Sequence, residues 1–119
     1  LHSGYEYIEE PSEEQVAAAR AAVDAGADLV VGHHAHILQG IHRYNDGVIA
    51  YGLGNFLFNI DGPPETAILN VWLDRDGVRQ LEVIPAIVQQ YGQPRLADFS
   101  GPILSRVYYL TTILNAANP

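Results

Sequence analysis

A short apolar run, Leu29 to Val31, ends at Gly32 and leads directly into histidines at positions 33, 34 and 36. A β-branched run that ends in glycine is typical of a buried strand opening into a loop, where α/β folds place their chemistry. Neutral imidazoles are common metal ligands, so this cluster indicates a metal site. The pair that meets the ion is His34 with His36, or His33 with His36 across a tight turn. The competing interpretation is that one or two of these histidines only cap the strand or bond backbone carbonyls.

Composition limits the classes of fold and partner. With 119 residues and 48% hydrophobic content, the chain fits one modest core, so we predict a single domain over residues 1–119. The formal charge of −8 opposes binding to nucleic acid, and no nucleic-acid partner is expected. The absence of cysteine leaves His, Asp, Glu, Asn or water as metal ligands. No run approaches the roughly 20 apolar residues of a membrane span, so we expect a soluble chain. The chain contains no methionine, and we expect it to be cut from a larger protein.

Local signals predict a helix followed by a strand. Ser12 and Gln15 fit a capping box after Pro11, and Gly26 suits the left-handed position that ends a helix. The strand is predicted over residues 28–31. The apolar face of the helix is expected to comprise Val16, Ala19 and Val23.

The rest of the chain is predicted to contain mostly strands. The sequence Asn45-Asp46-Gly47 suits a tight hairpin turn, and Pro85 is expected to mark the edge or the end of a strand. The predicted strands cover residues 41–44, 48–51, 66–73 and 78–84, a loop covers 92–102, and a last helix covers 103–114.

Residues 51–58 are predicted to form an apolar strand interrupted by Gly52, Gly54 and Asn55. Two glycines near a strand end allow the backbone to approach another loop or a ligand closely. The Asn55 amide suits a metal, a phosphate or a local turn.

Three segments together resemble a known family: residues 1–7 (LHSGYEY), 25–40 (AGADLVVGHHAHILQG) and 51–58 (YGLGNFLF). They are similar to bacterial capsule-synthesis and poly-γ-glutamate biosynthesis proteins of the CapA type, within the calcineurin-like metallophosphoesterase superfamily. The resemblance runs from residue 1 to at least residue 58. Residues 84–85 and 93–96 look like the C-terminal region of that family.

The resemblance implies an α/β fold, the C-terminal part of a four-layered α/β/β/α metallophosphoesterase-like sandwich with metals at strand ends. Its motifs fall on residues 2–7, with Ser3 in place of tryptophan, and on residues 32–36, with Ala35 in place of proline. The site residues that it implies are His2, His34 and His36 as metal ligands, His33 as a catalytic donor or further ligand, and Tyr5, Glu6 and Asn55 as groups that contact the ligands or the substrate.

The resemblance also implies partners. Superfamily members take aspartate, asparagine and a further histidine from an N-terminal half, and this chain holds no counterpart. We therefore expect the missing N-terminal half of the same protein as a partner, and two divalent ions (Mn, Fe or Zn) in the full-length protein. Alone, the fragment is expected to be inactive and to self-associate through exposed strand edges and the apolar faces of Leu69, Val71 and the Phe56–Phe58 segment.

Three functional classes remain open. The first is metal-dependent hydrolysis in the full-length protein, with an anionic polymer or a phosphoester as substrate. The second is a non-catalytic component that handles or exports the capsule polymer and keeps a vestigial metal site. The third is a structural fragment whose surface histidines bind metal adventitiously. By resemblance, the full-length protein is expected to be membrane-associated or extracytoplasmic.

Overall fold

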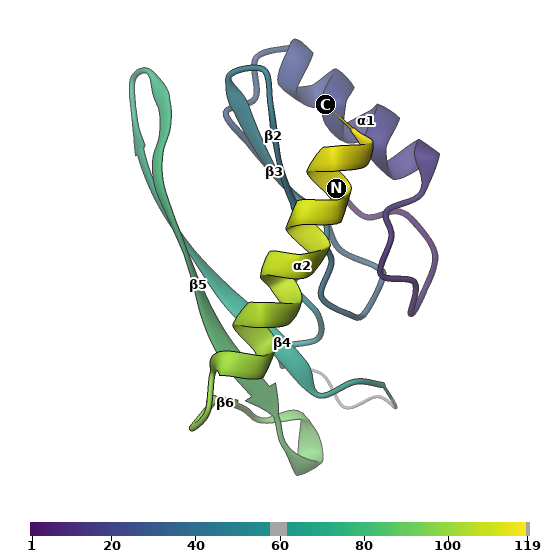
Figure 1. Cartoon of the computed structure of the whole chain (residues 1–119), viewed down its shortest axis with the longest axis vertical. Coiled ribbons are helices and arrows are strands. Elements are labelled where there is room, and N and C mark those ends of the chain that lie inside the picture. Colours follow the sequence, from purple (N-terminus) through teal and green to yellow (C-terminus); the bar gives the residue numbers. More distant parts are fainter. Residues whose placement is uncertain (58–61, 119) are drawn as a thin grey trace.

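Two α-helices and two small three-stranded sheets form an α/β domain in residues 1–57 and 62–118, which this computed structural model describes (Figure 1). The first sheet has the strand order β1-β3-β2 and the second has the order β4-β5-β6. The α/β class predicted from the sequence is confirmed.

Helix α1, Glu13–Asp24, begins where its capping signal predicts. The Gln15 N–H donates to the Ser12 hydroxyl at 3.2 Å, and the Ser12 N–H donates to Gln15 Oε1 at 3.0 Å, so the capping box is complete. Gly26 follows the helix with a φ of +103°, the left-handed conformation that glycine adopts without strain. Ala19 and Val23 are buried, and Val16 packs against them.

The first sheet contains β1 (Leu29–Val31), β2 (Ile41–Tyr44) and β3 (Gly47–Ala50). The predicted hairpin is confirmed as the antiparallel pair β2 and β3, with Asn45 at a φ of +48° in its turn. Strand β1 pairs with β3 in parallel. Parallel strands end at the same edge of a sheet, so the histidine loop after β1 and the glycine-rich segment after β3 begin side by side.

The prediction of a strand over residues 51–58 is wrong. Strand β3 ends at Ala50, and beyond it the chain forms only an isolated bridge between Leu53 and Leu38, as far as Leu57. Gly54 has a φ of +77°, which breaks the extended backbone. Phe58 lies outside the described residues.

The second sheet is antiparallel and contains β4 (Glu65–Asp74), β5 (Gly77–Val88) and β6 (Pro94–Leu96). The hairpin of β4 and β5 is longer than predicted. Strand β6 lies in the region predicted to be a loop, after a 3-10 turn at Gln90–Gly92, because the edge of β5 offers it backbone hydrogen bonds.

The prediction that Pro85 marks the edge or end of a strand is wrong, because Pro85 lies within β5, the central strand of the second sheet. Its ladder partner Ala67 donates its N–H to Leu53 O, away from Pro85. The Pro85 carbonyl accepts from Ala97, just past the end of β6. Proline is tolerated here because its missing N–H falls where pairing with β6 stops.

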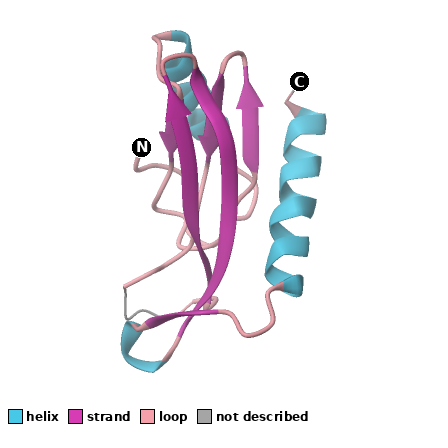
Figure 2. Ribbon diagram, turned by 90° about the vertical axis from the view of Figure 1, so that its left-hand side faces the viewer, coloured by secondary structure: helices cyan, strands magenta, loops and turns pink. Residues whose placement is uncertain are grey.

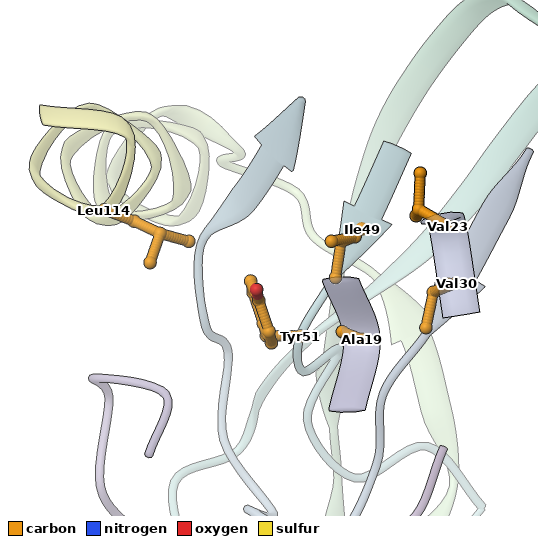
Figure 3. Close-up of a cluster of buried hydrophobic side chains, with 6 residues drawn as sticks. All are labelled: Ala19, Val23, Val30, Ile49, Tyr51 and Leu114. Atoms are coloured by element: carbon orange, nitrogen blue, oxygen red, sulfur yellow. The ribbon is translucent and has the colours of Figure 1, made fainter. Parts of the chain in front are cut away.

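Helix α2, Gly101–Ala117, packs against strands of both sheets. It extends beyond the predicted range at both ends. It runs alongside the strands (Figure 2). Its buried residues recur at helical spacing, and they are Ile103, Val107, Leu110 and Leu114. The first two pack in a cluster with Leu38 and Ala67, whereas Leu114 joins the cluster around Ile49 and Tyr51 (Figure 3).

The polar side of α2 covers the outer edge of β2. Thr111 Oγ1 accepts from the Ile41 N–H at 3.0 Å, and Asn115 Nδ2 donates to the Ile41 carbonyl at 2.8 Å. These bonds satisfy backbone groups that an open strand edge would expose. Among residues 1–57 and 62–118, neither helix has the length and apolarity that crossing a membrane requires.

Several apolar side chains outside these clusters remain accessible. Leu69 and Val71 on β4 are half-buried, whereas Phe56 is 42% and Leu57 is 77% exposed. Of the apolar residues expected to be exposed, Phe56 and Leu57 are exposed and Leu69 and Val71 are only partly so. Phe58 lies outside the described residues.

A buried histidine in the first sheet makes stability depend on pH. His42 is 1% exposed, and its ring stacks on that of Tyr51 at a centroid distance of 6.4 Å. Burial lowers the pKa of His42 below its usual value and the charge of Arg20 lowers it further, although a bond to the Asn118 backbone opposes both. The unfolded chain therefore binds this proton more readily than the folded protein.

We predict that the free energy of unfolding falls as the pH drops below about 6.5, the ordinary histidine pKa, and that His42→Phe reduces this loss. Phenylalanine keeps the stacked ring but takes up no proton. Urea unfolding at about pH 7.5 and about pH 5 measures both proteins. An equal loss of stability in the variant would contradict a role for His42.

Candidate metal centre

The backbone around the histidine cluster is fixed by close contact between two loops. The Gly32 N–H donates to the Ala50 carbonyl at 2.7 Å, and a Cβ atom at Gly32 would clash with the Tyr51 carbonyl. Further along, the Gly54 N–H donates to the Ile37 carbonyl at 3.1 Å. The glycines therefore serve the close approach of one loop to another, one of the alternatives that the sequence left open.

The first residues of the chain lie along the other side of the histidine loop. His2 and His33 form a parallel bridge, and the Ser3 N–H donates to the His33 carbonyl at 3.2 Å. The Tyr7 N–H donates to the Ala35 carbonyl at 2.8 Å. Segments 1–7 and 33–36 are thus held together, although they are remote in sequence.

This arrangement gathers Glu6, His34 and His36 into one group. Their ligand atoms all lie within 4.8 Å of one another, and Glu6 Oε1 is 4.0 Å from His36 Nε2. Two ligands of one ion, each about 2.1 Å from it, are at most ~4.2 Å apart. The Glu6 side chain is 54% exposed and has room for the small movement required. Two imidazoles and a carboxylate therefore fit one divalent ion.

Asn55 orients one of these ligands. Its Oδ1 lies 2.7 Å from His36 Nδ1, so in a neutral imidazole the Nδ1–H donates to the amide oxygen. The lone pair is then on Nε2, the atom nearest Glu6. A hydrogen bond to the far nitrogen fixes the tautomer of metal-binding histidines in this way.

The other predicted histidines lie beside this group. The ring centroid of His2 is 4.7 Å from that of His34, which in turn is 6.0 Å from that of His36. Partial desolvation lowers the pKa of His33, and the charges of the N-terminal ammonium group and of His2 lower it further. His33 therefore favours its neutral form near pH 7, as a ligand or a proton acceptor requires.

Backbone strain is concentrated at the same place. His34, His36 and Tyr7 have φ values of +102°, +60° and +60°. Each residue in such a conformation costs about 1–3 kcal/mol and persists only when surrounding contacts impose it. In the described chain, the remaining non-glycine residue of this kind is Asn45, in the hairpin turn. Strain at adjoining positions of one site suggests a functional role.

Of the two predicted neighbours in the first segment, the structure brings Glu6 to the histidines and leaves Tyr5 63% exposed. Tyr7, which was not among the predicted site residues, has its ring 6.1 Å from that of His36. Its signal was available, because Tyr7 is the last residue of the motif at positions 2–7.

Two cavities lie near this site. One of about 230 Å³ is lined by the four clustered histidines and Asn55. The other, of about 650 Å³, is largely apolar and is lined by Tyr7, Ile103 and Arg106 among others, and Ile37 lines both. The Arg106 guanidinium bonds both carboxylate oxygens of Glu9 at the wall of the larger cavity.

The chain matches a known protein family and several curated proteins. The family described as bacterial capsule synthesis protein PGA_cap matches residues 1–60. The chain is 43% identical over 96 residues to "Capsule biosynthesis protein CapA" of Bacillus anthracis, covering 79% of this chain and 23% of that protein. It is 41% identical over 91 residues to "PGA biosynthesis protein CapA" of Bacillus subtilis (strain 168), covering 75% of this chain and 24% of that protein.

A further relative is "Uncharacterized protein y4sH" of Sinorhizobium fredii, 34% identical over 113 residues, which cover 94% of this chain and 24% of that protein. The chain thus spans about a quarter of the length of the curated relatives that it matches.

We predict that Gly32→Ala lowers the free energy of unfolding by at least about 2 kcal/mol, because the added methyl group meets a backbone carbonyl that cannot move aside. The matched control is Gly101→Ala, where the nearest atom, in Phe99, is 3.6 Å away. The control should change stability by no more than about 0.5 kcal/mol or raise it. Urea unfolding measures both, and equal effects would refute the close approach.

Proposed function

We propose that this chain, which belongs to the bacterial capsule synthesis protein PGA_cap family, provides part of the metal site of a metal-dependent hydrolase. The observation that carries the proposal is the convergence of Glu6, His34 and His36. In the proposed arrangement the chain forms the C-terminal part of a four-layered α/β/β/α sandwich, with the site at the strand ends. This arrangement is supported by the contacts of α1 and α2 with the sheets and by the parallel pairing of β1 with β3.

The proposed ligands are His34 and His36, joined by Glu6 and by His2, whose ring lies next to that of His34. A divalent ion at such a site supplies Lewis-acid chemistry, which makes water nucleophilic near neutral pH and offsets charge on a phosphoryl oxygen. Mn, Fe and Zn all accept imidazole and carboxylate ligands. Two ions close together also require a bridging carboxylate, which we propose comes from another part of the full-length protein.

In this proposal the remaining residues orient the metal ligands and contact a phosphoester substrate. Asn55 holds the proton of His36 on Nδ1 and thereby places the lone pair of the neutral ring on Nε2, as a metal ligand requires. His33, whose lowered pKa favours the neutral form, either joins the ligands or donates a hydrogen bond from its ring N–H to the substrate oxygen. Tyr7 and Ile37 form the wall towards the larger cavity, where the organic part of the substrate has room.

A second candidate function is favoured by Arg106. In this alternative the protein handles an anionic polymer without cleaving it, and a polymer carboxylate replaces that of Glu9 on the Arg106 guanidinium. The name of the Bacillus subtilis relative, a PGA biosynthesis protein, supports such a partner. A membrane-associated or extracytoplasmic location of the full-length protein suits both candidates.

We predict that the protein binds Zn²⁺ and that His36→Ala weakens binding by at least about 10-fold, because a ligand is lost. Binding should also weaken as the pH falls, because an imidazole that carries a proton on both nitrogens cannot bind an ion. Calorimetric titration measures the affinity. The matched control is His42→Phe, which removes a histidine of the core outside the site and should leave the affinity unchanged.

In the full-length protein, His36→Ala should also abolish most metal-stimulated hydrolysis of a generic phosphodiester. If the wild type binds no zinc, or the His36 variant binds it as tightly, the proposed metal centre is wrong. Unchanged function of the His36 variant in capsule production would favour polymer handling.

For the second candidate, we predict that Arg106→Gln weakens binding of poly-γ-glutamate by about 10-fold, because a charge-assisted bond to carboxylate is worth about 1.5 kcal/mol. Arg75→Gln is the matched control, since the Arg75 side chain is 92% exposed and remote from the cavity. Fluorescence anisotropy with labelled polymer measures the affinity. Equal binding by both variants would count against the Arg106 cavity as the polymer site.

A further inference from the structure

Two buried glutamine side chains are hydrogen-bonded to each other near the candidate metal centre. Gln15 is 2% exposed and Gln39 is 1% exposed. Gln15 lies in the first turn of α1, and Gln39 lies three residues after the histidine cluster. The Gln15 Nε2 donates to Gln39 Oε1 at 3.3 Å. Burying a primary amide is costly unless it is hydrogen-bonded, so the partners of these two amides are part of what holds the surrounding backbone in place.

The pair holds both ends of the segment that carries Glu6. Gln39 Nε2 donates to the Ile8 carbonyl at 2.9 Å, on the C-terminal side of Glu6. On the other side, Gly4 packs so closely on the Gln15 side chain that a Cβ atom at residue 4 would overlap with it. Gln15 is itself fixed, because its Oε1 accepts from the Ser12 N–H at 3.0 Å.

Between these two anchors the segment adopts the conformation that brings Glu6 to the histidines. The Tyr7 φ is +60°, a strained value that needs outside contacts to persist. The Glu6 side chain is more than half exposed, so its own packing does little to place the carboxylate. The position of Glu6 relative to His36 therefore depends on the backbone contacts at residues 4 and 8, together with the bond from the Tyr7 N–H to the Ala35 carbonyl.

We propose that Gln39 is a positioning residue for Glu6, acting through the Ile8 carbonyl and supported by Gln15. This inference rests on the proposed metal centre. This positioning role requires glutamine at residue 39, because the same side-chain amide must donate to the Ile8 carbonyl and accept from Gln15 Nε2. Methionine has a similar length but can do neither, and glutamate has no N–H to donate.

The experiment is a double-mutant cycle on Zn²⁺ affinity with Gln39→Met, Glu6→Gln and the double variant. We expect each single variant to bind zinc about 10-fold more weakly, as for other residues that orient a metal ligand. We expect the double variant to bind no more weakly than the weaker single one, because both changes remove the same carboxylate. Gln80→Met, at an exposed site on β5, is the matched control and should bind as the wild type does.

A spectroscopic readout separates positioning from general loosening of the fold. With Co²⁺ as the probe, Gln39→Met should give the same visible absorption spectrum as Glu6→Gln, because the same ligand is absent. If Gln39→Met does not fold, the wild type still provides a test. The side-chain amide signal of Gln39 should shift when zinc is added to the wild type, and it should not shift in Glu6→Gln.

The outcomes distinguish the two proposals. If the wild type binds no zinc, or if Glu6→Gln binds zinc as tightly as the wild type does, the proposal of a metal centre with Glu6 as a ligand is wrong. If wild type and Glu6→Gln behave as expected but Gln39→Met retains full affinity, Gln39 does not position Glu6. The positioning role would also be overturned if the losses of zinc affinity were additive in the double variant. The same holds if the Gln39 side-chain amide signal of the wild type did not shift when zinc is added.

Discussion

The parallel pairing of β1 with β3 is the constraint on which the candidate site depends. It brings the ends of both strands to one edge, and the contact of Gly32 with the backbone at residues 50 and 51 continues the pairing into the loops. His36 from the first loop and Asn55 from the second can meet only because this approach is so close. Any side chain at residue 32 would separate them.

A second constraint is that the site stores backbone strain and the surroundings balance it. His34, His36 and Tyr7 occupy conformations that L-residues avoid, and each lies in a segment fixed by backbone bonds to a neighbouring one. The buried amides of Gln15 and Gln39 extend this support into the core, where α1 packs on the first sheet. Fixed geometry of this kind suits metal ligands, because reorientation on binding would reduce affinity.

The predictions from sequence succeeded where short-range chemistry decides the structure. The capping box of α1, the turn at Asn45 and the hairpin of β4 and β5 all follow from residues within a few positions of one another. They failed where distant partners decide. Residues 51–57 pair with the loop at residues 37–39, Pro85 is accommodated by the end of β6, and β6 forms on an edge that β5 provides.

The candidate site shows the same division. The residue types of a metal centre, three clustered histidines with Glu6 and Asn55 elsewhere, are present in the sequence, as is the resemblance that the family match confirmed. The sequence could not show that Glu6, His34 and His36 form the closest group, or that Tyr7 and Gln39 belong to its surroundings. Those relations join segments about 30 residues apart. Only the pairing of strands and the backbone contacts between loops in the folded chain bring them close together.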